Sequence, residues 1–345
     1  MMFATRKSAH WACAILFLFS ISAVSAQQLP APPTQPTTGP GGSEYPFGEM
    51  IEHSYGEGAD HYWIFEPSDP TPKSAPVIVF CHGWGAISPN IYGAWIRHLV
   101  RRGNIVIYPQ YQEVMFAPLL SYTAHCLSGE KAAMAELQTG KHVTPELDHV
   151  AVVGHSLGGA IAPNLAAVAS SENLPVPKAI CCVEPANHNN FMPAIEIPLV
   201  DDSKIPADTL VQIIVGDRDQ VARQDTAQKI FYRLSQIPKT GKNYIMLISD
   251  DHGSPPLIGN HMAPVALETI DGSTENQSDL RERWKSRTAN AMDFYGIWKL
   301  FDGLTDAAFY GKNKDYALGD TSEQRYMGKW SDGTPVKELK VIAQP

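Results

Sequence analysis

The fold of this chain is decided by the segment His149–Gly158, whose sequence is HVAVVGHSLG. Its first half is mostly apolar and rich in valine, which predicts a buried strand. The Gly-x-Ser-x-Gly that follows predicts a sharp turn, because the two glycines permit a tight backbone path that holds Ser156 in a strained conformation. Ala160–Ala169 then favours a helix, whose first amides stabilise negative charge. Strand, turn and helix together are typical of a nucleophile elbow, with Ser156 as the candidate nucleophile.

The rest of the chain alternates between strand-like and helix-like segments. Apolar runs predict strands at Tyr62–Phe65, Pro76–Cys81, Ile105–Tyr108, Val150–Val153, Ala179–Val183, Leu210–Val215 and Tyr244–Ile248. Helices are predicted at Ile91–Arg102, Leu119–Leu137, Leu157–Ala169, Thr226–Gln236 and Trp284–Leu304. Continuous Val and Ile runs indicate strands that are buried on both faces. The alternation therefore predicts an α/β fold with a mostly parallel, doubly wound sheet and helices on both faces.

The N-terminal part of the chain differs in composition from the rest. Met1–Ala26 has the positive start, the apolar stretch and the small-residue end of an export signal, which predicts cleavage after Ala26 and a secreted or periplasmic protein. The apolar stretch is short for a membrane span, so no stable membrane insertion is expected after cleavage. Residues 27–46 are rich in proline and glycine and predict an extended linker. Residues 47–345 are predicted to form a single domain.

Charge and cysteine content limit the classes of partner. The signal carries two positive charges and no negative one, so its removal takes the net charge from −9 to −11. Such an acidic protein is a poor candidate for binding nucleic acid. The remaining cysteines are Cys81, Cys126, Cys181 and Cys182, and their spacing indicates neither a disulfide pairing nor a zinc site. Asn276 begins a glycosylation sequon, which has meaning only in a eukaryotic secretory pathway.

A nucleophilic serine needs a base, and the base needs an acid that orients it. Behind an elbow of this kind the acid precedes the histidine along the chain, and each lies on a loop that follows a strand. Asp217 and Asp219 follow the sixth predicted strand. His252 lies close behind the seventh strand, and His261 lies further along the same loop. The chain thus supplies both partners in the expected order, with two candidates for each.

In these residues the sequence resembles the α/β-hydrolase family and, within it, secreted cutinase-like and dienelactone-hydrolase-like serine esterases. The resemblance covers nearly the whole chain after the signal in the order of its elements, although only short motifs are specific. It implies Asp219 as the acid, three residues after a strand-end glycine, with Asp217 as a turn residue. It favours His252, which precedes a glycine, as the base. His261, in the sequence NHMAP, is the alternative base and otherwise a structural or pocket-lining residue.

Attack on a carbonyl creates an oxyanion, which needs hydrogen-bond donors that already point at it. The amide of Leu157, directly after the nucleophile, is one expected donor. By resemblance, the His-Gly-Trp-Gly sequence of residues 82–85 is an oxyanion loop in which the amide of Trp84 is the second donor. The Trp84 ring is also expected to pack along the substrate.

The resemblance and the residues together predict an exported serine hydrolase that cleaves carboxylic esters through an acyl-enzyme intermediate. The reaction requires no metal and no cofactor, and the expected partner is a small-molecule, lipid or polymer ester. Because the same catalytic residues serve any acyl transfer, a peptidase or an acyltransferase is an alternative. A catalytically silent binding protein of the same fold is a second alternative.

Two connections bear on substrate access. The gap Glu184–Thr209, where many relatives carry a lid domain, is interrupted by prolines and is too short for an independent core. An open site is therefore expected. The segment Gly253–Arg283 is longer than in compact cutinases and is expected to form one wall of the site.

Overall fold

The computed structural model describes residues 29–114, 116–188, 195–222, 224–270 and 288–345. The predicted export signal, the sequon at Asn276 and the start of the last predicted helix lie outside these residues. Among the described residues, no helix is long and apolar enough to cross a membrane.

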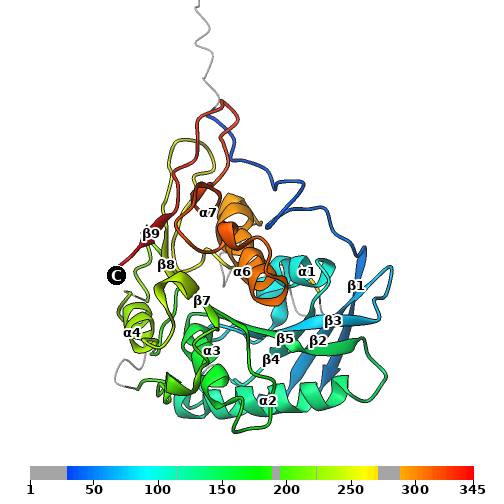
Figure 1. The fold of residues 1–345 in the computed structure, drawn as a ribbon. Helices are drawn as coiled ribbons and strands as arrows, with labels where there is room; N and C mark the ends of the chain where they lie inside the picture. The colour runs from blue at the N-terminus through cyan, green and yellow to red at the C-terminus, as the bar shows by residue number, and fades with distance from the viewer. Residues whose placement is uncertain (1–28, 115, 189–194, 223, 271–287) are drawn as a thin grey trace, which may run out of the picture.

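The described residues form one mixed sheet with the strand order β1-β2-β4-β3-β5-β6-β7-β8-β9 (Figure 1). Its strands are β1 (Glu49–Tyr55), β2 (Tyr62–Ser68), β3 (Ser74–Cys81), β4 (Ile105–Pro109), β5 (Thr144–His155), β6 (Ala179–Val183), β7 (Leu210–Gly216), β8 (Lys242–Leu247) and β9 (Lys340–Ile342). The strands from β4 to β8 in that order are parallel, whereas β1, β2 and β9 run antiparallel to their neighbours. The predicted mostly parallel sheet is confirmed.

The central strands are buried on both faces, as their continuous apolar sequences predict. Every residue of β4 and β6 is buried, and β3 is buried after its first residue. All seven predicted strands are present. The sequence analysis missed β1, which is only half-buried, and β9, which has three residues, because neither has a continuous apolar run.

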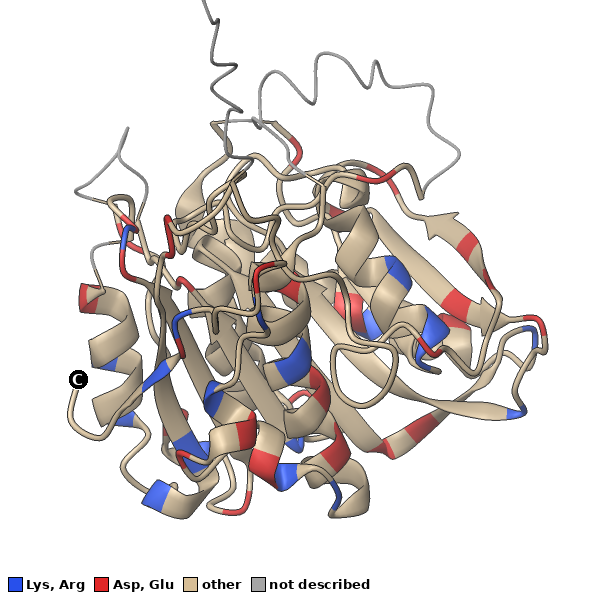
Figure 2. Ribbon diagram, turned by 90° about the horizontal axis from the view of Figure 1, so that it is seen from above, with Lys and Arg blue, Asp and Glu red and all other residues tan. Residues whose placement is uncertain are grey.

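Helices cover both faces of the sheet. Their bounds are α1 (Gly93–Arg101), α2 (Tyr122–Leu137), α3 (Leu157–Val168), α4 (Asp225–Arg233), the π-helical η6 (Met292–Trp298), α6 (Lys299–Tyr310) and the short α7 (Ser322–Arg325). Side chains of α1, η6 and α6 pack in one core cluster, whereas those of α2, α3 and α4 pack in the clusters of the opposite face. Lys and Arg residues are interspersed with Asp and Glu residues over the ribbon (Figure 2).

The predicted linker is extended, but its described part is attached to the folded body. The amide of Gly41 donates to the buried carboxylate of Asp302 (2.7 Å), and the hydroxyl of Tyr45 lies 2.9 Å from Nδ1 of His98. Further back, the amide of Ser254 donates to the carbonyl of Pro30. A proline-rich sequence without an apolar period can thus still dock on the folded body through hydrogen bonds.

The buried carboxyl of Glu130 makes stability depend on pH. Glu130 lies on α2, is 1% exposed, and its Oε2 has no hydrogen-bond partner among the described residues. Burial raises the pKa of Glu130 from 4.5 to about 8. Between these values the unfolded chain has released the proton and the folded chain has kept it, so the free energy of unfolding falls by about 1.4 kcal/mol per pH unit.

We predict that Glu130→Gln stabilises the protein by an amount that grows as the pH rises from 5 to about 8. The glutamine amide does not titrate, so the free energy of unfolding of the variant lacks this fall with pH. Urea denaturation of both proteins across this range measures the difference. Parallel stability curves would show that Glu130 is ionised in the folded state.

Candidate active site

Ser156 lies at the junction of β5 and α3 in a strained backbone conformation. Its φ of 55° and ψ of −121° lie outside the regions that residues with a side chain prefer. A Cβ on Gly154 would overlap the carbonyl of Gly158, and a Cβ on Gly158 would overlap the carbonyl of Cys81. Both glycines of the motif are therefore required by close backbone contact. The contact at Cys81 presses the first turn of α3 against the end of β3.

The imidazole of His261 lies between Ser156 and Asp219. Its Nε2 is 2.9 Å from the serine Oγ, and its Nδ1 is 2.9 Å from Oδ2 of Asp219. Ser156 and His261 are 8% and 9% exposed. The three side chains thus form a hydrogen-bonded row, with the nucleophile candidate at one end and a carboxylate at the other.

The preference for His252 over His261 is wrong in this structure. His252 Nε2 bonds to the carboxylate of Asp332 at 2.8 Å, and its side chain is 38% exposed. The chain leaves β8 and first makes an excursion, closed by paired hydrogen bonds between Asp250 and Leu257, that carries His252 outward. Proximity to the strand end was therefore misleading.

The same loop then returns to the sheet before it reaches His261. The amide of Gly259 donates to Ser249 Oγ, and the carbonyl of Gly259 accepts from the amide of Arg218 in the loop after β7. These bonds hold the returning chain at the carboxyl ends of β7 and β8. The base candidate consequently comes from the long segment Gly253–Arg283, which was expected to form a wall of the site.

The hydrogen-bond partners of the two acid candidates distinguish their roles. Asp217 accepts from the amide and the hydroxyl of Ser249, which makes it a loop residue between β7 and β8. Asp219 Oδ1 accepts from the amides of Val221 and Ala222, which leaves Oδ2 for His261. Burial raises the pKa of Asp219, but the hydrogen bond from His261 and these amides outweigh it and lower the pKa below its usual value. The carboxylate beside His261 is therefore ionised.

The loop predicted to hold the oxyanion lies against the nucleophile. A Cβ built on Gly83 would be 3.3 Å from Cβ of Ser156, so Trp84 directly follows a glycine that lies close to the serine. The amide of Gly85 donates to Gln112 Oε1 at 2.8 Å, which anchors the far side of the loop. Leu157 is the first residue of α3, where backbone amides have no partner within the helix. Both predicted donor residues thus border Ser156.

A buried hydrogen-bonded row that the sequence analysis did not predict links this loop to the base. The amide of Gly83 donates to the hydroxyl of Tyr92 (3.0 Å), and that hydroxyl lies 2.8 Å from Nδ1 of His155. His155 Nε2 donates to the carbonyl of His261 at 2.8 Å. Burial and the nearby His261 hold the pKa of His155 well below its usual range. Its neutral ring has one proton, which the carbonyl of His261 fixes on Nε2, so Nδ1 accepts from Tyr92.

A second carboxylate lies beside the base. Glu184 follows β6 with a φ of 45° and is fully buried. Its Oε2 is 3.8 Å from Nδ1 of His261 and 4.0 Å from Nε2 of His155. Its position directly after a parallel strand was the available signal, because the carboxyl ends of such strands surround the site. His155, Glu184 and His261 are close enough to share a metal ion, but the imidazole nitrogens already face Tyr92, the His261 carbonyl, Ser156 and Asp219.

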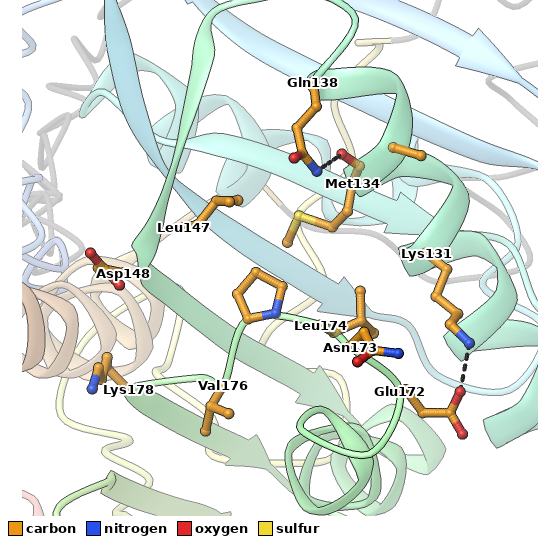
Figure 3. A pocket seen from close by; sticks show the side chains of 12 residues that line it. Lys131, Met134, Gln138, Leu147, Asp148, Glu172, Asn173, Leu174, Val176 and Lys178 are labelled. Atoms are coloured by element: carbon orange, nitrogen blue, oxygen red, sulfur yellow. Dashed lines mark hydrogen bonds and ion pairs between the residues drawn. The ribbon is translucent and has the colours of Figure 1, made fainter.

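A separate hollow of about 690 Å³ lies between α2 and the loop before β6 (Figure 3). Lys131 and Glu172 form an ion pair of 2.5 Å at its rim, and Leu147 and Val176 line it. None of its lining residues belongs to the row at Ser156. The chemistry of the site therefore resides at the carboxyl edge of the sheet rather than in this hollow.

The order of the strands, the parallel centre of the sheet and the strand–turn–helix at Ser156 decide the fold. The chain has the α/β-hydrolase fold. Residues 59–196, less than half of the chain, match the family model described as Chlorophyllase. The chain is also similar to a solved structure reported in a study of two fungal esterases from Rhizomucor miehei. The match covers 70% of this chain and 84% of the other, with 14% sequence identity and a TM-score of 0.48. No curated protein matches the sequence.

We predict that Tyr92→Phe lowers the free energy of unfolding of the protein by about 2–4 kcal/mol, because the buried Gly83 amide and His155 Nδ1 both lose their partner. Urea denaturation measures the loss. Tyr232→Phe, which removes an exposed hydrogen bond to Pro345, is the matched control and should change stability by less than about 0.5 kcal/mol. Equal effects of the two substitutions would contradict the role of the buried row.

Proposed function

We propose that this α/β-hydrolase is an exported serine esterase that cleaves carboxylic esters with Ser156, His261 and Asp219. The proposal is carried by one observation, the position of the His261 ring at 2.9 Å from both the serine hydroxyl and the Asp219 carboxylate. A base must lie within hydrogen-bond reach of the proton that it takes, and its tautomer must be fixed by a third group. His261 meets both requirements.

In the first half of the reaction, His261 Nε2 takes the proton of Ser156 as Oγ attacks the ester carbonyl. Asp219 holds the remaining ring proton on Nδ1 and stabilises the imidazolium that forms. The amides of Leu157 and Trp84 donate to the oxyanion of the tetrahedral intermediate. His261 then gives its proton to the leaving alkoxide, and the alcohol departs from the acyl-enzyme.

In the second half, water replaces the alcohol. His261 takes a proton from the water molecule as its oxygen attacks the acyl carbonyl, and the same two amides stabilise the second oxyanion. Return of the proton to Ser156 Oγ releases the carboxylic acid. Each step uses only this chain's own residues and the two substrates, ester and water.

Apolar side chains beside the oxyanion loop favour an ester with an apolar acyl or alcohol part. The rings of Phe116 and Trp84 lie 5.9 Å apart, and Val114, Phe116 and Leu120 are each more than half exposed. Gln112 ties this segment to the oxyanion loop, since it accepts from Gly85 and donates to the carbonyl of Val114. We therefore propose a small-molecule, lipid or polymer ester, and no nucleic acid, as the partner.

Export is proposed from the composition of Met1–Ala26. Cleavage after Ala26 would leave a secreted or periplasmic enzyme whose chain continues into the docked segment before β1. N-terminal sequencing of the protein recovered outside the cytoplasm tests the cleavage point.

We predict that Ser156→Ala and His261→Ala each lower kcat for p-nitrophenyl butyrate by at least about 10³-fold, because they remove the nucleophile and its base. His252→Ala is the matched control and should keep the parent rate, since its ring bonds to Asp332 at the surface. Loss of activity in His252→Ala with retention in His261→Ala would contradict the assignment. Faster cleavage of a peptide p-nitroanilide than of the ester would favour the peptidase alternative.

We predict that Phe116→Ala lowers kcat/KM for p-nitrophenyl dodecanoate by about tenfold and leaves hydrolysis of the acetate unchanged, because only the long chain reaches the apolar segment. Leu147→Ala, which truncates an exposed apolar side chain in the separate hollow, is the control. Equal effects on both esters would place the acyl chain elsewhere.

A further inference from the structure

A second cluster of chemically active side chains lies at the other edge of the sheet, where β1 pairs with β2. His53 on β1 faces Ile64, and Ile51 faces Glu66 on β2, so His53 and Glu66 are diagonal neighbours on one face of the ribbon. His142, from the connection between α2 and β5, joins them. The mechanism above uses none of these three residues.

The rings of His53 and His142 both contact the same carboxylate oxygen of Glu66. Oε2 of Glu66 is 2.9 Å from Nε2 of His53 and 2.7 Å from Nδ1 of His142. The other oxygen, Oε1, accepts the amide of Val143 at 2.6 Å, which fixes the orientation of the carboxylate. All three potential ligand atoms lie within 4.8 Å of one another. The cluster therefore presents two imidazole nitrogens and one carboxylate oxygen to one point.

The surroundings of His142 make this arrangement more than an ion pair. Its side chain is 1% exposed, and its second nitrogen, Nε2, lies 3.3 Å from Glu136 Oε1 and 3.2 Å from the hydroxyl of Tyr55. A neutral imidazole has one ring proton and cannot donate to both Glu66 and Glu136, whereas an imidazolium donates to both. A metal cation on Nδ1 satisfies both carboxylates with a neutral ring, because the single proton then belongs to Nε2 and faces Glu136. This carboxylate–histidine–metal order is the usual outer arrangement of a zinc ligand.

We propose that His53, Glu66 and His142 bind one Zn²⁺ ion through Nε2, Oε2 and Nδ1, with water in the fourth position. Two imidazoles and a carboxylate are a common three-ligand set for tetrahedral zinc. Zinc bonds of about 2.0–2.1 Å put neighbouring ligand atoms about 3.3 Å apart, so the two contacts between an imidazole nitrogen and Glu66 Oε2 need to open by about half an ångström. The ion would enter past His53, whose side chain is 32% exposed.

The site would tie the edge ribbon to the α2–β5 connection and is independent of the proposed ester hydrolysis. Two of its ligands come from the neighbouring strands β1 and β2, and the third comes from the segment after α2, which is distant from them in sequence. Zinc bound to the folded chain stabilises it against unfolding. The melting temperature should therefore rise with zinc while esterase activity stays the same.

Zinc chloride titration of the metal-free full chain, by calorimetry and by metal analysis after dialysis, tests the site. We expect one ion per chain for the parent. His125→Ala is the matched control, because this exposed histidine bonds to Asp60, away from the three ligands, and should leave zinc binding unchanged. His53→Ala should lose the ion. Glu136→Gln, which alters the outer partner alone, should weaken binding by about 10- to 100-fold.

Cobalt as a spectroscopic probe places the ion at residue 53. In His53→Cys the thiolate replaces an imidazole, so the Co²⁺ complex should gain a thiolate-to-metal charge-transfer band that the parent lacks. Absence of stoichiometric zinc from the parent, equal binding by His53→Ala, or a bound Co²⁺ whose spectrum is the same in His53→Cys would each overturn the proposal. The three residues would then be an ordinary hydrogen-bonded network.

Discussion

The candidate active site depends on the close contact between the first turn of α3 and the end of β3. Only a glycine at position 158 permits it, because a Cβ there would overlap the carbonyl of Cys81. At the same junction Gly83 approaches Ser156, and the serine has a φ of 55° where β5 turns into the helix. Nucleophile and oxyanion loop are thus positioned by one backbone constraint.

The base is positioned by hydrogen bonds rather than by a strand. His261 belongs to a long loop, but its carbonyl is held by His155 and its ring by Asp219. Through Tyr92, His155 also connects to the Gly83 amide, so the oxyanion loop and the base loop share one buried row. These hydrogen bonds explain how a loop can present a histidine to the nucleophile in a fixed tautomer.

The sequence analysis predicted the features that local sequence patterns encode, and it missed those that depend on the path of the loop after β8. Continuous apolar runs predicted the central strands, and the Gly-x-Ser-x-Gly context placed Ser156 at the elbow. The choice between His252 and His261 depended on the Asp250–Leu257 excursion, whose hydrogen bonds leave no pattern in the sequence. The proposed zinc ligands were missed for a similar reason, because His53, Glu66 and His142 meet only through strand register and the α2–β5 connection.

The most direct test of the account is covalent labelling of the serine with an organophosphate ester, followed by mass analysis of the peptide that contains Ser156. Labelling requires an activated hydroxyl and is independent of the acyl specificity of the enzyme. The account predicts rapid stoichiometric labelling of the parent and of His252→Ala, and a rate near background for His261→Ala. Labelling of His261→Ala at the parent rate, with loss of labelling in His252→Ala, would contradict it.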